Sequence, residues 1–64
     1  TQTTTGDVSV AYNNLGWSLQ QLRRYQGAIA AYQEAIRLKP ESSRYANNLA
    51  AVRSIASQSA GTNP

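Results

Sequence analysis

The stretch that decides the fold is YNNLGWSLQQLRRYQGAIAAYQEAIRLKP, residues 12–40. It contains two segments in which apolar residues recur at spacings of three or four, which places their side chains on one face of an α-helix. In the first segment these residues are Tyr12, Leu15, Leu19 and Leu22. In the second segment they are Tyr25, Ala28, Ile29, Tyr32, Ala35 and Ile36. The pattern predicts two amphipathic helices, over residues 8–22 and 26–38, that are joined by a short turn.

Small residues lie on both apolar faces. Gly16 lies on the first face, and Ala28 and Ala35 lie on the second. A glycine inside a helix costs about 1 kcal/mol relative to alanine, so its presence indicates a packing requirement. Residues without bulk allow two helix backbones to approach closely. We therefore expect a helical hairpin whose two helices touch at Gly16 and Ala28.

These residues resemble the pattern of a tetratricopeptide repeat, in which an aromatic residue, Leu-Gly and a second aromatic residue are followed by Ala, an aromatic residue and Pro. The matching residues are Tyr12, Leu15, Gly16, Leu19, Ala28, Tyr32, Ala35 and Pro40. Tyr12 and Leu19 differ from the usual Trp and Tyr but remain bulky and apolar. Arg23 stands where the family often has a glycine that ends the helix. The resemblance covers one repeat of about 34 residues and implies an antiparallel helical hairpin.

A partial copy of the first helix follows Pro40. A shift by the period of the family, about 34 residues, aligns Asn47, Asn48 and Leu49 with the first segment's Asn-Asn-Leu. We expect a third helix over residues 43–57, and its inward residues are Tyr45, Leu49, Val52 and Ala56. Arg53 replaces a leucine and the following residues are polar, as is typical of the last element of a repeat array. The expected fold class is all-α: a hairpin of the tetratricopeptide type with a third, C-terminal capping helix, which together form a fragment of an α-solenoid.

The two ends of the chain are polar. We expect residues 1–7 to be a disordered leader, residues 8–57 to form the three-helix domain, and residues 58–64 to be a flexible tail. Asp7 or Ser9 is expected to cap the first helix, because an oxygen-bearing side chain can accept a hydrogen bond from its free amides. The chain begins with Thr, and we expect it to be excised from a longer repeat protein.

The composition argues against an enzyme. The 64 residues include no Cys and no His, which removes disulfides, thiol chemistry and most zinc sites. We therefore expect no cofactor and no metal. The acidic residues Asp7, Glu34 and Glu41 do not form a pair with helical spacing, and the chain has no glycine-rich phosphate loop. The sequence does not identify a compartment, and the cytoplasm is our default expectation.

The net charge is +3, but the basic residues are not arranged as in a surface that binds nucleic acid or a membrane. Such a footprint gathers basic residues on one face, whereas here they are spread over three segments, partly at helix ends where they complement the helix dipole. The basic residues are Arg23, Arg24, Arg37, Lys39, Arg44 and Arg53. We expect neither nucleic acid nor membrane as a partner, and a slight preference for an acidic protein or peptide.

The resemblance also implies a binding surface. In tetratricopeptide proteins the first helix of each repeat lines a concave face that grips an extended peptide or a helix. The residues at the corresponding positions are Val10, Asn13, Asn14, Trp17, Gln20 and Gln21 in the first helix, and Arg44, Asn47, Asn48, Ala51 and Ile55 in the third. These residues are the expected partner-binding site.

Within this expected site, the asparagines and the tryptophan allow two interpretations. Asn14 and Asn48 occupy equivalent positions one repeat apart, as do Asn13 and Asn47. Asparagine offers both a donor and an acceptor, so a ladder of these amides could hold a peptide backbone. Alternatively, the asparagines are ordinary helix surface or bridge neighbouring helices. Trp17 lies off the apolar face and is either an interface anchor or packed sideways onto the third helix.

Two functions therefore follow from the sequence. The first is a protein–protein interaction module, a short scaffold that binds a partner on its concave face. The second is a structural module that self-associates into a homo-oligomer by helix stacking, because one and a half repeats bury little surface alone.

Overall fold

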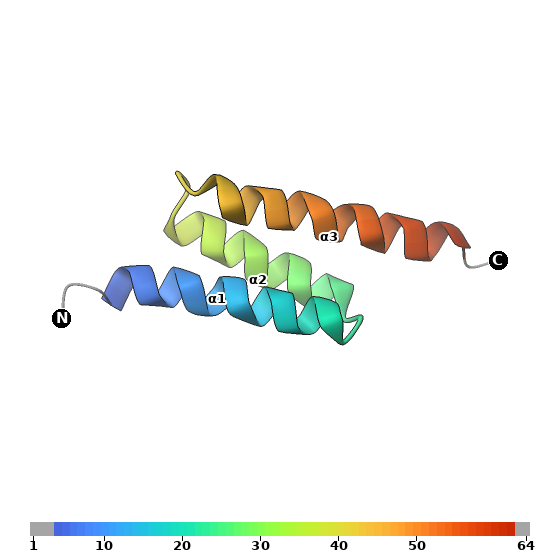
Figure 1. Ribbon diagram of the computed structural model, residues 1–64, viewed down its shortest axis with the longest axis horizontal. Coiled ribbons are helices and arrows are strands. Elements are labelled where there is room, and N and C mark those ends of the chain that lie inside the picture. Colours follow the sequence, from blue (N-terminus) through green and yellow to red (C-terminus); the bar gives the residue numbers. More distant parts are fainter. Residues whose placement is uncertain (1–3, 63–64) are drawn as a thin grey trace.

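Three α-helices account for most of the chain: α1 (Thr4–Gln21), α2 (Tyr25–Leu38) and α3 (Ser43–Thr62). The structure is a computed structural model that describes the backbone of residues 4–62 and the side chains of residues 8–58. α1 and α3 run in the same direction and α2 runs between them in the opposite direction (Figure 1). α2 packs against both neighbours, whereas contact between α1 and α3 is slight. The expected hairpin with a third, capping helix is confirmed.

Two of the helices are longer than the sequence predicts. α1 begins at Thr4 rather than at residue 8, and α3 continues to Thr62 rather than ending at residue 57. Threonine, serine and glycine have low helix propensity, which is why the sequence predicts shorter helices. Each residue added to the end of an existing helix nevertheless gains a backbone hydrogen bond, so the helices extend into these segments. Residues 4–7 and 58–62, which the sequence assigns to the leader and the tail, are therefore helical in the structure, and residues 1–3 and 63–64 lie outside the described part.

The core is built around α2. Ala28, Tyr32 and Val52 form its centre, and partly buried apolar side chains, including Leu19 and Leu49, pack against them. Ala31 is also buried, although it lies outside the predicted apolar face. It is buried because α2 has a helix on each of two sides, so more than one face is covered.

α1 approaches α2 closely at Gly16. A Cβ atom added there would lie 2.7 Å from Cε1 of Tyr32 and 2.8 Å from its Cδ1, which is too close for two carbon atoms. The Tyr32 ring is almost fully buried, and its hydroxyl donates a hydrogen bond to Oε1 of Gln20 at 3.2 Å. Burial also raises the pKa of the Tyr32 hydroxyl. The ring thus occupies the space that the missing side chain of Gly16 leaves free.

Two leucines expected in the hairpin contact are on the surface. Leu15 is 48% exposed and Leu22 is 67% exposed. The reason is the rotation of α1 about its own axis, which directs Gly16 toward Tyr32. Leu15 precedes Gly16 by one residue, so its side chain is rotated by about 100° away from α2, and Leu22 lies in the turn after the helix. Of the predicted apolar face of α1, Tyr12 and Leu19 remain half-buried.

The turn between α1 and α2 closes on an arginine in a left-handed backbone conformation. Arg23 has φ 64°, a value that favours glycine. The amide of Arg23 donates to the carbonyl oxygen of Gln20 at 3.0 Å, and the amide of Arg24 donates to that of Leu19 at 2.8 Å. This pair of bonds is the Schellman motif. The chain therefore forms the turn that the family usually builds with glycine, but with a side chain at the strained position.

The Gly16 contact predicts opposite effects for two glycine substitutions. Gly16→Ala should lower the free energy of unfolding by about 1–3 kcal/mol, because the new methyl group displaces the buried Tyr32 ring. Gly27→Ala is the matched control and should raise the free energy of unfolding slightly, because alanine favours the helix more than glycine does. Its Cβ would lie 3.3 Å from Cδ1 of Leu19, and that flexible side chain can move to make room. Urea denaturation followed by circular dichroism measures both. A Gly16→Ala variant as stable as the parent would show that the described contact is wrong.

The strained turn predicts that Arg23→Gly stabilises the protein. Removing a side chain from a left-handed backbone position relieves about 1 kcal/mol of strain, which in a chain of this size raises the melting temperature by about 4–8 °C. The matched control is Arg24→Gly, because Arg24 has φ −94° and no such strain. That variant should melt at or below the temperature of the parent. Equal melting temperatures for Arg23→Gly and Arg24→Gly would contradict the proposed strain.

Candidate surface for protein binding

One strip of α1 is turned to the surface along its whole described length. Its residues recur at spacings of four, three and four, and all four side chains are exposed. They are Val10, Asn14, Trp17 and Gln21. We call them the α1 strip. Trp17 is 57% exposed, so the alternative in which it packs onto α3 does not describe this structure.

α3 presents a matching set of side chains next to the α1 strip. Arg44, Asn47 and Ala51 are exposed, whereas Asn48 and Ile55 are half-buried. The α1 strip and these three exposed residues of α3 together are called the α1–α3 face below. This face lies on the side of the α1–α3 pair that points away from α2.

Two hydrogen bonds between side chains connect α1 with α3. Nδ2 of Asn48 donates to Oδ1 of Asn13 at 2.8 Å. The hydroxyls of Ser9 and Tyr45 lie 3.3 Å apart and share a hydrogen bond. Ser9 is fully buried inside α1, so its expected role as a helix cap is wrong. The side chain of Asp7, the other expected cap, lies outside the described residues.

These bonds divide the expected binding residues into two groups. Asn13 and Asn48 bond to each other, and Gln20 accepts the bond from Tyr32, so these three half-buried side chains help to hold the helices together. The bridging interpretation therefore applies to the pair Asn13–Asn48. Asn14 is exposed, and it does not form a matched ladder with Asn48. Of the remaining expected residues, Ile55 is half-buried and the others are exposed to solvent: Val10, Asn14, Trp17, Gln21, Arg44, Asn47 and Ala51.

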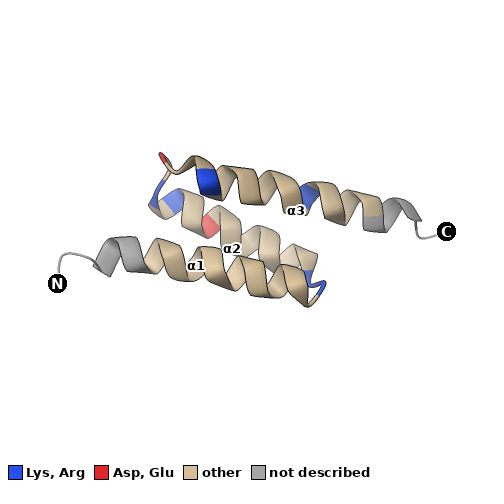
Figure 2. Cartoon of the chain, in the orientation of Figure 1, with Lys and Arg blue, Asp and Glu red and all other residues tan. Residues whose placement is uncertain are grey.

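Charge is distributed unevenly over the surface. Residues 8–22 contain no charged side chain, and most charges lie near the ends of the helices (Figure 2). Arg37 and Glu34 form an ion pair on the exposed side of α2, and the hydrogen bond from Arg37 lowers the pKa of Glu34. In the part of the chain that the structure describes, neither Lys39 nor Arg44 takes part in an ion pair.

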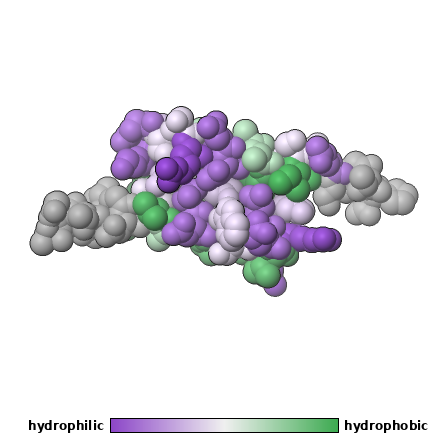
Figure 3. Space-filling view, viewed as in Figure 1, coloured by the Kyte–Doolittle hydropathy of each residue, from purple (hydrophilic) through white to green (hydrophobic). Residues whose placement is uncertain are grey.

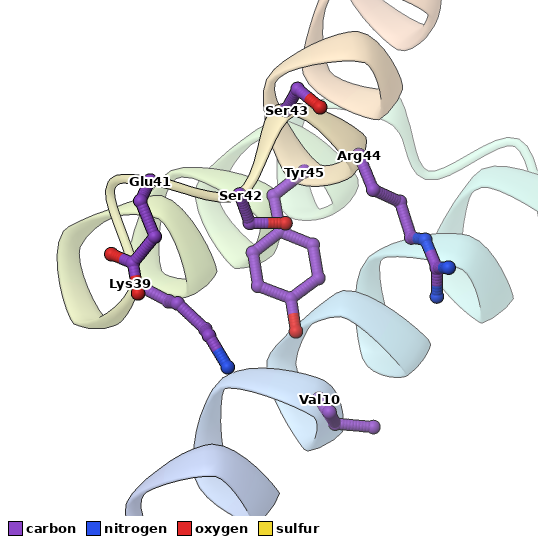
Figure 4. Close-up of a pocket in the computed structure, with 7 residues that line it drawn as sticks. All are labelled: Val10, Lys39, Glu41, Ser42, Ser43, Arg44 and Tyr45. Carbon is purple, nitrogen blue, oxygen red and sulfur yellow. The ribbon is translucent and has the colours of Figure 1, made fainter.

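A pocket lies at one end of the α1–α3 face, where the turn between α2 and α3 meets α1 (Figure 4). Its volume is about 440 Å³. The residues that line it include Val10, Lys39, Glu41, Ser42, Arg44 and Tyr45. Only Val10 and Arg44 of these residues belong to the binding site that the sequence predicts, because the helix dipole already accounts for Lys39 and the core for Tyr45. Lys39 precedes Pro40 and Arg44 follows it by four residues. Two basic residues on either side of a proline turn are the sequence feature that indicates this pocket.

The described residues offer little for catalysis or metal binding. Among them, no three His, Cys, Asp or Glu side chains are grouped so that they could hold a metal ion. None of the described helices is both long enough and apolar enough to cross a membrane. What the α1–α3 face offers is an exposed aromatic ring, amides that can donate and accept hydrogen bonds, and two cations at one end.

Comparison with known proteins identifies one family. The family model described as Tetratricopeptide repeat matches residues 9–42. This span covers most of α1, all of α2 and the turn that leads to α3, so it corresponds to the hairpin. Searches of curated proteins and of solved structures found no match.

Proposed function

The chain belongs to the tetratricopeptide repeat family, and we propose on that basis that it binds a peptide or a helix of a partner protein on its α1–α3 face. Repeats of this family generally mediate protein–protein interactions and are not catalytic. The observation that carries the proposal is the exposure of Trp17 on a helix whose opposite side is packed against the core.

The surroundings of Trp17 suit a binding anchor. Asn14 and Gln21 lie within one turn of it on the α1 strip and offer hydrogen bonds to a peptide backbone. The hydrogen bond between Asn13 and Asn48 joins α1 to α3 about one helical turn before Trp17. Tryptophan is also among the residues that contribute most to protein interfaces.

The proposal predicts that Trp17→Ala removes binding without unfolding the protein. Burial of the indole against a partner contributes a few kcal/mol, whereas in the free protein the ring has few contacts to lose. Leu22→Ala is the matched control, because Leu22 is also an exposed apolar residue and lies in the turn after α1, outside the α1–α3 face.

The measurement is selection of a displayed library of random 12-residue peptides on the immobilised 64-residue chain. Selected peptides should bind the parent and Leu22→Ala, but not Trp17→Ala, whose melting temperature should stay close to that of the parent. Peptides that bind Trp17→Ala as well as the parent would place the interaction elsewhere, and a lower melting temperature would make Trp17 part of the core.

Self-association is the second candidate function, and a different surface favours it. Val8 and Leu15 are seven residues apart on α1 and are exposed on the side away from the α1–α3 face, and Leu22, exposed in the turn that follows, continues the same spacing. Figure 3 shows patches of hydrophobic residues, in green, at the lower edge of the molecule, where α1 lies. This side carries no charge between residues 8 and 22, so two copies could pair through it without repulsion there.

This second function predicts a concentration-dependent increase in mass. Sedimentation velocity should show dimers or larger species of the parent as its concentration rises toward the millimolar range. Leu15→Glu should remain monomeric and folded, because it places a charge in the middle of an exposed apolar side. A parent chain that stays monomeric up to millimolar concentration would remove the support for this candidate.

A further inference from the structure

We infer that two copies of the chain pair through α1 in opposite directions and thereby combine their α1 strips into one surface. In this pair Val8 and Leu15 of each copy lie opposite Ser18 and Ala11 of the other. The inference rests on self-association, the second candidate function. It adds the direction of the pairing, its register and its consequence for the α1 strip.

Large and small residues alternate along the outward side of α1. Val8 and Leu15 are seven residues apart, and Ala11 and Ser18 follow them by three residues each. All four side chains are exposed, and at about 100° per residue they share a strip about 80° wide. Alternating spacings of three and four residues are those through which two helices pair along their length. We call these four residues the α1 seam.

The order of large and small residues favours opposite directions. A twofold axis at the level of Asn13 brings Val8 of one copy opposite Ser18 of the other, and Leu15 opposite Ala11. Every layer of the seam then combines one large and one small side chain, so the layers interdigitate and two helices can pack closely. A parallel pair would instead place each residue opposite itself and alternate thick layers with thin ones.

The distribution of charge also favours opposite directions. Residues 8–22 carry no charge, whereas Arg23 and Arg24 follow directly. A parallel pair would bring the arginines of both copies together. In the antiparallel pair the two arginine turns lie at opposite ends, each about one helical turn beyond the position of Asp7 in the other copy. The dipoles of the two helices then also run in opposite directions, which is favourable.

The end of α1 selects the register. α1 ends at Gln21, so all four residues of the α1 seam lie within the helix, whereas Leu22 lies in the turn that follows. A register shifted by one heptad would place Leu22 opposite Ala11 and Val8 opposite Tyr25 of α2. Both of its outer layers would therefore involve residues beyond the end of α1. The register centred at Asn13 forms its layers between regular helices only.

The pairing leaves the α1 strip open and places two of these strips on one side. The centre of the α1 strip lies about 110° around the helix from the centre of the α1 seam. A twofold axis that relates two antiparallel helices runs perpendicular to both, and it leaves directions parallel to itself unchanged. Both α1 strips therefore face the same side of the pair. The two Trp17 residues lie about 12 Å apart along the helices, so one partner can engage both rings.

The α1 seam is short, so the pair is expected to be weak. Val8 is 39% exposed and Leu15 is 48% exposed. The surface that four residues of each copy can cover is well below that of a stable dimer, and we expect a dissociation constant of about 0.1–1 mM. A covalent link between facing residues can trap a pair of this strength, because it makes the association intramolecular.

The test introduces single cysteines into the intact 64-residue chain, which has no cysteine of its own. Val8→Cys and Ser18→Cys are mixed at about 1 mM in a glutathione redox buffer, and mass spectrometry measures the disulfide-linked dimers. The mixed dimer should exceed either homodimer by about tenfold or more. The reason is that the two copies of the same residue lie about 15 Å apart along the helices, which is too far for a disulfide.

Two further mixtures test specificity and register. Ala46→Cys is the matched control for Val8→Cys, because Ala46 is an exposed residue of α3 outside the α1 seam. Its mixture with Ser18→Cys should give no more mixed dimer than chance encounters produce. Ala11→Cys with Leu22→Cys represents the register shifted by one heptad, and it should give less mixed dimer than Val8→Cys with Ser18→Cys.

Trp17 reports whether the α1 strip stays open. It is the single tryptophan of the chain, so the fluorescence of the protein measures its exposure directly. Acrylamide should quench this fluorescence in the disulfide-linked dimer of Val8→Cys and Ser18→Cys as strongly as in the reduced, diluted monomer. Weaker quenching in the dimer would bury Trp17 in the contact and overturn the inference.

Three cross-linking results would also overturn it. They are homodimers of Val8→Cys as abundant as the mixed dimer, a mixture with Ala46→Cys that cross-links equally well, and a higher yield for the shifted register. Sedimentation of the parent chain separates these results from a failure of the proposed function. A parent that dimerises with a different cross-linking pattern keeps self-association and loses this geometry. A monomeric parent without specific cross-links loses both, and a second copy is then not the occupant of the α1 seam.

Discussion

The contact between the Tyr32 ring and the backbone at Gly16 determines the arrangement of the rest of the molecule. No other residue type at position 16 would allow the ring to lie so close to α1, because a Cβ atom would overlap it. The contact sets how α1 is rotated about its own axis. With Gly16 directed at α2, Ser9 and Asn13 are directed at α3, and Val10 and Trp17 are directed at solvent. The exposure of the α1 strip is thus a consequence of one packing requirement on the opposite side of α1.

The sequence predicted the features that depend on apolar periodicity. The hairpin, the third helix and the burial of Tyr32, Tyr45 and Val52 all follow from residues spaced three or four apart. The same periodicity could not predict the rotation of α1. Its apolar face is broad enough to accept several rotations, and placing Leu15 and Leu22 in the contact was the wrong choice among them. The close approach at a single glycine, rather than the centre of the apolar face, sets the rotation.

The polar bonds between α1 and α3 could not be read from the sequence for a different reason. Ser9 and Tyr45 are 36 residues apart, and Asn13 and Asn48 are 35 apart. Neither pair matches the repeat period of about 34 residues, so aligning the two copies pairs the wrong residues. The residues proposed to bind a partner, in contrast, come from the family resemblance, and most of them lie on the surface. The pocket was not predicted, because Lys39 and Arg44 come together only when the chain turns at Pro40.

The central position of α2 has a consequence for the order in which the chain folds. The apolar core forms between α2 and its two sequence neighbours, and α1 and α3 are joined mainly by polar side chains. The connections on either side of α2 span only three and four residues. Proteins in which contacts are mostly local fold within microseconds to milliseconds, because little loop entropy is lost before each contact forms. Either hairpin can therefore form first, and both routes require α2 to be helical before the other helix can add to it.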